Sequence, residues 1–448
     1  MKTNVLSILL LFCLTVTGSM NTRAEEQTRY VGGDISMLPQ YEKHNKGYKD
    51  AYGTKIGNLI TWFVQECGWN TFRVRIFVHP DGSDLTVCQD LAYVTALGKR
   101  IKEAGAYFML DFHYSDTWVD ATHIQAPAAW QGADNASMAD SVAWHTRTVL
   151  ETLKAAGAAP DLVQVGNEIM YGLCGIKVSP YDDASRNANW PAYIALLQAG
   201  CNAVRDVLPE AKIIIHTDRP TNKSYDYFYY NKLVQGGVDY DIIGLSYYPF
   251  WHVGMTPTAS TTAAQALQPL VSAINYLKNQ FPDKRVQLVE TAYVFNTWPG
   301  DANYNTQPVW ACSQAGQYQF VKDLVDAMLP LENVTGINYW FPEEAGNGDD
   351  SNWSAGGATV MTKWLGRGFW SLNQSSSPHA INRTAKPAEG QDPAEVCAPY
   401  YLGKFRGTDP QGVEENQKSQ VESRKILRNG QILILRNGKT YTLQGQVL

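Results

Sequence analysis

The stretch Leu162-Val163-Gln164-Val165-Gly166-Asn167-Glu168 is a short β-rich run that ends in polar residues, and seven similar runs recur along the 448-residue chain. The eight runs are Tyr30–Ser36, Thr71–Val78, Tyr107–His113, Leu162–Glu168, Lys212–Thr217, Tyr240–Tyr248, Val286–Tyr293 and Val334–Phe341. Most are nearly continuous in Val, Ile, Leu and Phe, which is typical of parallel strands that are covered on both faces.

The segments between these runs have the apolar spacing of helices. This spacing is clearest in Tyr93–Ala104, Ala139–Ala156, Trp190–Leu208, Ala263–Phe281 and Gln314–Leu329. Eight strands that alternate with helices predict the α/β class and a single (β/α)8 TIM barrel with long loops. The active site of such a barrel lies at the carboxyl ends of its strands.

Composition excludes several classes of protein. The chain is 44% hydrophobic and 18% charged, so it is neither a disordered chain nor a membrane bundle. A net charge of −6 gives no electrostatic footprint for nucleic acid. The chain contains neither a nucleotide-binding glycine motif nor HExxH. We expect no nucleic-acid partner and no organic cofactor, and we expect the protein to be a monomer.

The amino terminus predicts export. Residues 1–24 read as a signal peptide, because a start with Lys2 precedes the apolar run Val5–Val16, which is too short to span a bilayer. We expect the mature protein in the extracellular space, at the cell surface or in the periplasm, and no other stretch is long and apolar enough to span a membrane. Six of the 7 cysteines lie beyond this run, and the sequence selects none of their fifteen pairings. We interpret them as structural or free.

Composition also divides the chain into domains. We assign residues 25–385 to the barrel domain, residues 386–423 to a linker-like segment and residues 424–448 to a short β-rich tail. The tail places Asn429-Gly430 and Asn437-Gly438 between apolar runs, a pattern that is typical of a small β-meander. Its role is either sorting or anchoring, or it is a remnant without a role.

Two carboxylates end opposite strands of the predicted barrel. Glu168 ends the fourth run, and Glu290 follows the apolar residues of the seventh. A carboxylate that closes an apolar strand either pairs with a cation or lies in a cleft. Retaining glycosidases use two carboxyl groups about 5–5.5 Å apart, one as nucleophile and one as acid/base. The pair therefore predicts either such an enzyme or two structural acids in salt bridges.

Asn-Glu at the end of the fourth strand and Glu at the end of the seventh resemble clan A of the glycoside hydrolases. The stretch Asp111–Asp120, which reads Asp-Phe-His-Tyr-Ser-Asp-Thr-Trp-Val-Asp, makes the resemblance more specific, and His123, Pro127 and Trp130 follow it. On these residues the chain resembles glycoside hydrolase family 53, the arabinogalactan endo-β-1,4-galactanases. Further support comes from Gly32–Ser36, Arg73–Val78, Gly166–Glu168 and Ser246–Phe250. The resemblance covers roughly Tyr30 to Trp370.

The resemblance implies a role for each strand-end residue. Glu168 would be the general acid/base and Glu290 the nucleophile of a retaining enzyme that hydrolyses β-1,4-galactan. Asn167 would hydrogen-bond the sugar 2-hydroxyl. Arg73 would keep Glu290 ionised, and Tyr248 would donate to it and fix its rotamer.

Four further residues are predicted to bind substrate. His113 ends the third run, and Asp34 lies in the first, where it either binds sugar or caps the loop. Trp118 and Trp340 are candidate stacking platforms, because the apolar face of a sugar packs on an indole ring. Asp111 is interpreted as a buried hydrogen-bonding partner.

One loop between the seventh and eighth runs suggests a metal. Asp301, Asn303 and Asn305 place oxygen side chains at alternate positions, the spacing that calcium loops use, although an Asn-rich turn explains them equally well.

Two other functions compete with a galactanase. The catalytic residues alone also fit a clan A endo-β-glycanase that acts on mannan, xylan or glucan. The second competitor is a non-catalytic glycan-binding protein on an inherited barrel.

Overall fold

The computed structural model describes residues 28–44, 47–80, 82, 86–296, 308–345, 366–371 and 378–407, together with the backbone of three strands between Ser423 and Tyr441. The barrel lies in the unit Arg29–Thr408, and the three tail strands belong to a second unit. The predicted signal peptide, residues 1–24, and the predicted calcium ligands Asp301, Asn303 and Asn305 lie outside the described residues.

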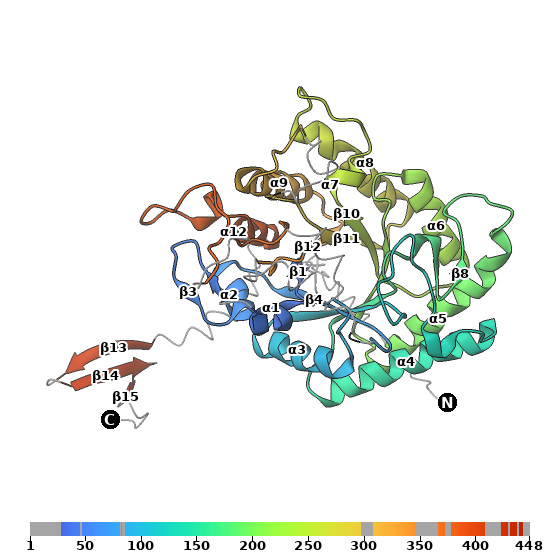
Figure 1. Ribbon diagram of the computed structural model, residues 1–448, viewed down its shortest axis with the longest axis horizontal. Coiled ribbons are helices and arrows are strands. Elements are labelled where there is room, and N and C mark those ends of the chain that lie inside the picture. The colour runs from blue at the N-terminus through green and yellow to red at the C-terminus, as the bar shows by residue number, and fades with distance from the viewer. Residues whose placement is uncertain are drawn as a thin grey trace, which may run out of the picture. The chain divides into compact units, whose positions relative to one another are not determined.

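Eight parallel strands close into a barrel (Figure 1). They are β1 (Tyr30–Asp34), β4 (Thr71–Ile76), β5 (Tyr107–Phe112), β6 (Leu162–Val165), β9 (Lys212–Thr217), β10 (Ile242–Tyr247), β11 (Arg285–Thr291) and β12 (Val334–Trp340). Each predicted run overlaps one of these strands, and the barrel closes where β1 pairs with both β4 and β12. The prediction of a (β/α)8 barrel is therefore confirmed.

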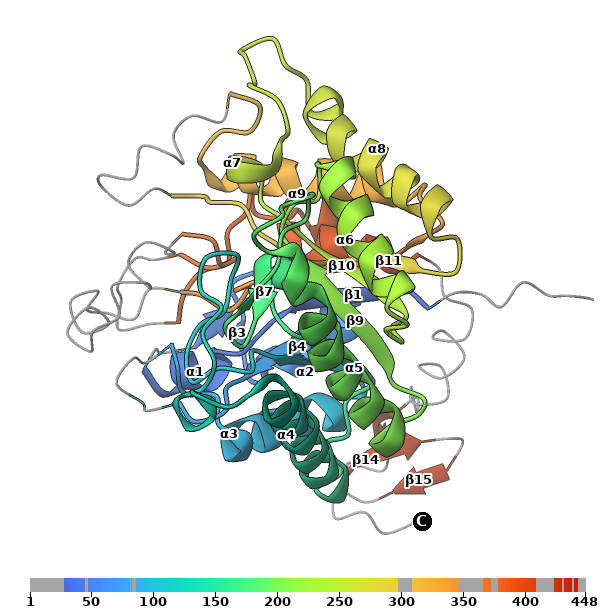
Figure 2. The ribbon, with the colours of Figure 1, turned by 90° about the vertical axis from the view of Figure 1, so that its right-hand side faces the viewer.

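Helices cover the outside of the barrel (Figure 2). The longer ones are α2 (Leu59–Glu66), α3 (Leu91–Glu103), α4 (Asn135–Ala155), α5 (Trp190–Val207), α6 (Lys223–Gln235), α8 (Ala263–Gln280) and α9 (Gln314–Met328). The five predicted helical segments correspond to α3, α4, α5, α8 and α9. No described helix is long and apolar enough to cross a membrane.

Polar side chains fix where these helices begin. Asp90 accepts a hydrogen bond from the backbone N–H of Tyr93 at the start of α3, and Asp134 does the same for α4. At the start of α8, Thr262 and Gln265 form a reciprocal capping box. Each cap satisfies backbone donors that have no partner within the helix.

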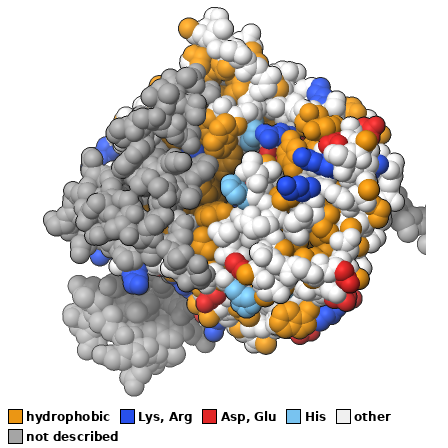
Figure 3. Space-filling view, turned by 45° about the vertical axis from the view of Figure 1, so that its right-hand side comes forward, with side chains coloured by type: hydrophobic (Ala, Val, Ile, Leu, Met, Phe, Trp, Pro, Cys, Tyr) orange, Lys and Arg blue, Asp and Glu red, His pale blue; other side chains and the backbone are white. Residues whose placement is uncertain are grey.

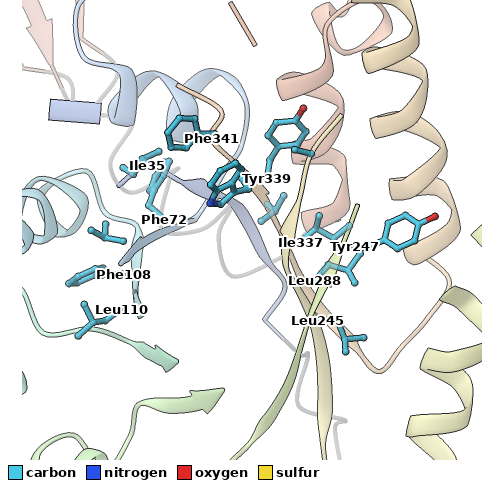
Figure 4. Packing of buried hydrophobic residues seen from close by; sticks show 14 of the residues in the cluster. Ile35, Phe72, Phe108, Leu110, Leu245, Tyr247, Leu288, Ile337, Tyr339 and Phe341 are labelled. Carbon is cyan, nitrogen blue, oxygen red and sulfur yellow. The ribbon is translucent and has the colours of Figure 1, made fainter. Parts of the chain in front are cut away.

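The main core lies between the strands and the helices (Figure 4). Side chains such as Phe72, Leu110, Leu245 and Ile337 point outward from the barrel and are fully buried. Because side chains alternate along a strand, their neighbours point into the barrel. A smaller apolar layer fills the barrel interior, and it consists of Met109, Leu162, Ile214, Ile242 and Val289.

A bulge in β11 changes the direction of its last side chains. Leu245 of β10 pairs with Leu288, but the next residue, Ser246, pairs with Glu290 and skips Val289. Val289 lies in the inner apolar layer, so strict alternation would turn Glu290 toward the helices. The bulge instead leaves Glu290 on the inner side, where it contacts other strand-end residues.

The segment after residue 386 packs against the barrel unit. Helix α12 (Ala398–Gly403) lies beside β1 and α9, the Trp69 indole donates to the carbonyl of Pro399 at 2.9 Å, and Tyr400 packs on Trp62. Arg29, just before β1, donates to the carbonyl of Phe405 at 3.3 Å. The prediction of a linker-like segment from residue 386 is wrong for residues 386–407, because their apolar side chains are buried on the barrel.

The tail forms the predicted antiparallel meander of β13 (Ser423–Arg428), β14 (Gln431–Arg436) and β15 (Lys439–Tyr441). In the barrel unit, the cysteines of the described residues are free thiols, and they are Cys67, Cys88, Cys174, Cys201, Cys312 and Cys397.

Candidate active site

Glu168 lies where β6 ends and the chain turns sharply. Gly166 has φ +91°, and a Cβ there would lie 2.7 Å from the side chain of Ile169, so glycine is required. Glu168 itself has φ 47°, a left-handed conformation that is uncommon for a residue with a side chain. The Ser246 hydroxyl on β10 donates to Oε1 of Glu168 at 2.6 Å. The turn therefore brings the carboxyl group to a fixed partner on another strand.

Glu290 lies near the end of β11 and is held at both of its oxygens. Nη1 of Arg73 contacts Oε1 at 2.8 Å, and the Tyr248 hydroxyl donates to Oε2 at 2.8 Å. The side chain is almost buried, with 7% of its surface exposed. A carboxylate with an arginine and a phenol as donors is stabilised in its ionised form.

Arg73 is the centre of a buried charge cluster. Its guanidinium contacts Oδ2 of Asp34 at 2.7 Å and Oδ2 of Asp111 at 2.7 Å, in addition to Glu290. It also donates to Oδ1 of Asn167 at 2.8 Å. Burial alone would lower the pKa of Arg73, but the three carboxylates outweigh it and raise the pKa. The cluster therefore keeps a permanent positive charge beside Glu290.

The two glutamates have different electrostatic surroundings. Burial raises the pKa of Glu168 well above its usual range, and the charges of Glu290 and Asp218 raise it further. Burial also raises the pKa of Glu290, and the charges of Asp34 and Asp111 add to this effect. Arg73 and the hydrogen bond from Tyr248 oppose it, so the pKa of Glu290 rises less than that of Glu168. No lysine or arginine of the described residues forms an ion pair with Glu168. The proton therefore belongs on Glu168 and the negative charge on Glu290.

Asp34 and His113 are buried supports of this cluster. Asp34 has no exposed surface, and its Oδ1 accepts from the backbone of Ser36 while Oδ2 contacts Arg73. Nε2 of His113 lies 3.2 Å from Oδ2 of Asp111, and its Nδ1 accepts from the backbone N–H of Val119 at 3.0 Å. Burial lowers the pKa of His113, so this histidine is neutral. Asp111 is the buried partner that the sequence predicts.

The predicted sugar contacts meet on one side of Glu290. The rings of Trp118 and Trp340 lie 6.4 Å apart, and Trp340 is also 6.4 Å from Tyr248. The guanidinium of Arg75 lies 4.1 Å from the centre of the Trp118 ring and supports it. Asn167 lies nearby, and its Nδ2 donates to the Val119 carbonyl at 2.7 Å. The structure thus brings aromatic and polar groups together beside the carboxyl pair.

Comparison with known proteins agrees with this geometry. The profile of glycosyl hydrolase family 53 matches residues 30–367. The chain belongs to glycoside hydrolase family 53. It is therefore a glycoside hydrolase, and the resemblance seen in the sequence is confirmed.

Named relatives share most of their length with this family 53 chain. An arabinogalactan endo-β-1,4-galactanase of Cellvibrio japonicus is 31% identical over 336 residues, which cover 72% of this chain and 82% of the relative. A probable arabinogalactan endo-β-1,4-galactanase A of Aspergillus fumigatus is 31% identical over 352 residues, with coverages of 76% and 89%. The family 53 catalytic domain of Ignisphaera aggregans superposes with a TM-score of 0.67 at 25% identity and covers 85% of this chain and 96% of its own.

Three residues of the family 53 site were not found from the sequence. Gln164, His216 and Ser246 are buried. Gln164 donates to Oδ1 of Asn167 at 3.3 Å, Nδ1 of His216 accepts from the backbone N–H of Glu168, and Ser246 donates to the carboxyl group of Glu168. His216 interrupts an apolar strand after Ile215, Gln164 lies three residues before Asn167, and Ser246 lies two residues before Tyr248. The sequence did contain a signal for these three residues, because each is a polar residue at an inward position of an apolar strand.

The metal prediction stays untested in this family 53 enzyme. The described residues contain no group of three or more His, Cys, Asp or Glu side chains that is arranged to hold a metal ion. Asp301, Asn303 and Asn305 lie outside those residues.

The surface of the family 53 barrel unit offers apolar groups to a ligand. In Figure 3, apolar side chains line a hollow that borders the grey atoms, and basic and histidine side chains lie on its other side. Arg73 and Arg75 are buried, so the cations of the cluster lie inside the barrel. Such a surface suits a neutral ligand with apolar faces, such as a chain of sugar rings.

Proposed function

We propose that the protein is a retaining endo-β-1,4-galactanase that hydrolyses galactan, including the side chains of type I arabinogalactan. The observation that carries the mechanism is the contrast between the two strand-end carboxyl groups. Glu290 has a cation and a phenol as partners, whereas the carboxyl group of Glu168 has a serine hydroxyl and no ion pair among the described residues. One protonated and one ionised carboxyl group are what acid-assisted cleavage of a glycosidic bond requires, and the resemblance to clan A supports retention.

In the first step, Glu290 attacks the anomeric carbon while Glu168 donates its proton to the glycosidic oxygen. The bond between the anomeric carbon and that oxygen breaks, and an ester between the sugar and Glu290 forms. Arg73 and Tyr248 fix the attacking carboxylate, because each holds one of its oxygens. Asn167 provides an amide at the strand end for the sugar 2-hydroxyl, a contact that strengthens in the transition state.

In the second step, Glu168 is a carboxylate and takes a proton from a water molecule. The water oxygen bonds to the anomeric carbon, and the ester bond to Glu290 breaks. Two inversions at the same carbon leave the product in the β configuration. Each step uses side chains of this chain and water.

The substrate is supported by the relatives and by the aromatic group. The relatives from Cellvibrio japonicus and Aspergillus fumigatus carry the name of β-1,4-galactanases. Trp118 and Trp340 offer indole faces beside Glu290, and such faces pack on the apolar side of a sugar ring. We assign them to stacking on galactosyl units at and next to the cleavage point.

Product analysis on linear β-1,4-galactan tests this proposal. We expect rapid release of reducing oligosaccharides, and proton NMR should detect the β anomer before mutarotation. Glu290→Ala should lose turnover on galactan and on an activated aryl galactobioside. Glu168→Ala should lose turnover on galactan but keep much of its kcat/KM on the activated substrate, because a good leaving group needs no acid.

A panel of polysaccharides separates the competing functions. Reducing ends released from mannan, xylan or glucan, with none from galactan, would assign the chain to another clan A substrate. Binding of galactan without any hydrolysis would make it a glycan-binding protein. Equal losses of Glu168→Ala on both galactan and the aryl substrate would overturn the assignment of Glu168 as the acid.

We also propose that the protein is exported. Lys2 and the apolar run Val5–Val16 support this location, as does a polymeric substrate that does not cross a cell membrane. Fractionation of the native host, followed by amino-terminal sequencing, should find a mature chain that begins after residue 18 or 24. An intact Met1 in the cytoplasmic fraction would contradict export.

A further inference from the structure

Glu168 is held at two points by residues of neighbouring strands. Ser246 of β10 donates to Oε1 of Glu168 at 2.6 Å, and Nε2 of His216 of β9 lies 2.8 Å from the Ser246 hydroxyl oxygen. Nδ1 of the same histidine lies 3.2 Å from the backbone nitrogen of Glu168. His216 therefore contacts the backbone of Glu168 directly and its carboxyl group through Ser246.

The backbone of Glu168 determines which nitrogen of His216 carries the proton. A backbone N–H is always a donor, so Nδ1 of His216 is the acceptor in this contact. Oδ1 of Asn167 also lies 3.1 Å from Nδ1, but this oxygen already accepts from Arg73, so the two acceptor atoms lie side by side without a hydrogen bond. The Gln164 amide nitrogen lies 3.1 Å from the same Nδ1 and donates to it as well. His216 is neutral, because burial lowers its pKa well below the usual range and the charge of Arg73 lowers it further. Its proton is therefore on Nε2 and points to Ser246.

The direction of the serine hydroxyl follows from that proton. Ser246 has one hydrogen, and its oxygen already accepts from Nε2 of His216. The hydrogen is therefore free to donate to Oε1 of Glu168. Both Ser246 and His216 are fully buried, so bulk water does not compete for these contacts.

We propose that His216 and Ser246 are positioning residues that keep Oε1 of Glu168 an acceptor and thereby place the transferable proton on Oε2. This inference rests on the proposed role of Glu168 as acid/base. In the first step, the proton leaves Oε2 for the glycosidic oxygen, and the resulting carboxylate keeps its hydrogen bond from Ser246. In the second step, Oε2 takes a proton from the attacking water. Ser246 and His216 keep their own protons throughout.

The hydrogen bond from Ser246 favours the ionised form of Glu168, so its loss should change the pH profile. Other charged or titratable groups also act on Glu168, and they are Glu290, Asp218, Asp120, Arg219 and Tyr248. None of these is altered by a change at Ser246. A shift of the alkaline limb of the pH profile, which reports the ionisation of Glu168, is therefore attributable to the loss of the Ser246 hydroxyl.

Ser246→Ala, compared with Tyr247→Phe, tests the proposal. Tyr247 is the next residue, and its buried hydroxyl has no hydrogen-bond partner among the described residues, so its removal is a matched control. For Ser246→Ala we expect the alkaline limb of kcat/KM on galactan to move up by about one pH unit. We also expect kcat/KM on galactan to fall about tenfold at the optimum, because a general acid contributes 10²–10⁴-fold and part of its alignment is lost. The aryl galactobioside should change less than about threefold, since its leaving group needs no acid.

A pair of histidine variants gives a second measurement. His216→Gln retains a donor toward Ser246 and should keep the wild-type alkaline limb, whereas His216→Leu should behave as Ser246→Ala. An unmoved alkaline limb with equal losses on both substrates, in Ser246→Ala or in His216→Leu, would overturn the positioning role. If the positioning role is overturned in this way, but Glu168→Ala loses turnover on galactan and keeps it on the aryl galactobioside, the proposed function stays intact. A Glu168→Ala enzyme that fails on both substrates would instead overturn the assignment of Glu168 as the acid, on which this inference rests.

Discussion

Replacing Arg73 with methionine tests the buried charge cluster. Methionine keeps an unbranched apolar chain but removes the guanidinium that contacts Asp34, Asp111 and Glu290 at 2.7, 2.7 and 2.8 Å. Three buried carboxyl groups then remain. Arg75 still forms an ion pair with one of them, Asp34, at 3.8 Å. Breaking a buried ion pair by removing one partner costs about 3–5 kcal/mol. We expect a loss of this size in the free energy of unfolding at pH 7.5.

The loss should depend on pH, and its direction follows from the pKa shifts. Burial alone would raise the pKa of Asp111, but in the wild type Arg73 lowers it below the usual value. This group therefore contributes stability that is present above about pH 4 and is lost as the pH falls. In Arg73→Met, burial raises the pKa values of the remaining buried carboxyl groups in the folded state above their values in the unfolded chain. The variant therefore loses stability as the pH rises from about 4. The difference between the two proteins is therefore largest at pH 7.5.

Urea unfolding, followed by tryptophan fluorescence at pH 4.5 and 7.5, measures this difference. Arg100→Met is the matched control, because Arg100 pairs with Glu42 on the surface at 2.7 and 2.8 Å while both side chains stay about one third exposed (31% and 35%). Its loss should be under about 1 kcal/mol at both pH values. The reasoning is refuted if Arg73→Met costs the same at both pH values, or no more than Arg100→Met.

Three further predictions use other parts of the structure. Tyr248→Phe removes the donor that lowers the pKa of Glu290, so the acidic limb of kcat/KM should move to higher pH; an unmoved limb in the pH profile would contradict the contact. Trp251→Ala should raise KM for long galactan more than for short oligosaccharides, because the Trp251 ring lies 5.6 Å from the Tyr248 ring and is 49% exposed. Trp144 on α4 is 66% exposed and is the control, and Trp144→Ala should leave both KM values unchanged. Dithiothreitol should leave Tm unchanged in a thermal scan, and a drop would reveal a disulfide among Cys67, Cys88, Cys174, Cys201, Cys312 and Cys397.

The barrel was predictable because its strands are buried on both faces. Such strands appear as continuous apolar runs, and the end of a run locates the mouth of the barrel. Glu168, Asn167 and Glu290 could therefore be assigned to one site before any contact was known. Arg73 and Tyr248 were assigned by the family resemblance, and each contacts Glu290 as expected.

The connections within the site were not predictable in the same way. His216 and Ser246 meet only because β9 and β10 pair in a particular register, which a single sequence does not specify. The inward direction of Glu290 depends on the bulge after Leu288, and alternation alone gives the opposite direction. The packing of residues 386–407 was missed because their three prolines and many small residues have the composition of a linker, whereas burial of Tyr400 and Leu402 in α12 decides their structure.

The contact between Arg29 and Phe405 ties the start of the barrel unit to its end. Arg29 precedes β1, so this junction lies at the amino ends of the strands, and Glu168 and Glu290 lie at the other end of the barrel. Chain ends that meet are the usual condition for circular permutation and for fusion to a second module. The chain could thus be opened at another loop and its original ends joined at this junction. A carrier could also be attached after Gly407. Both the junction and this attachment point lie on the side of the barrel away from the carboxyl pair.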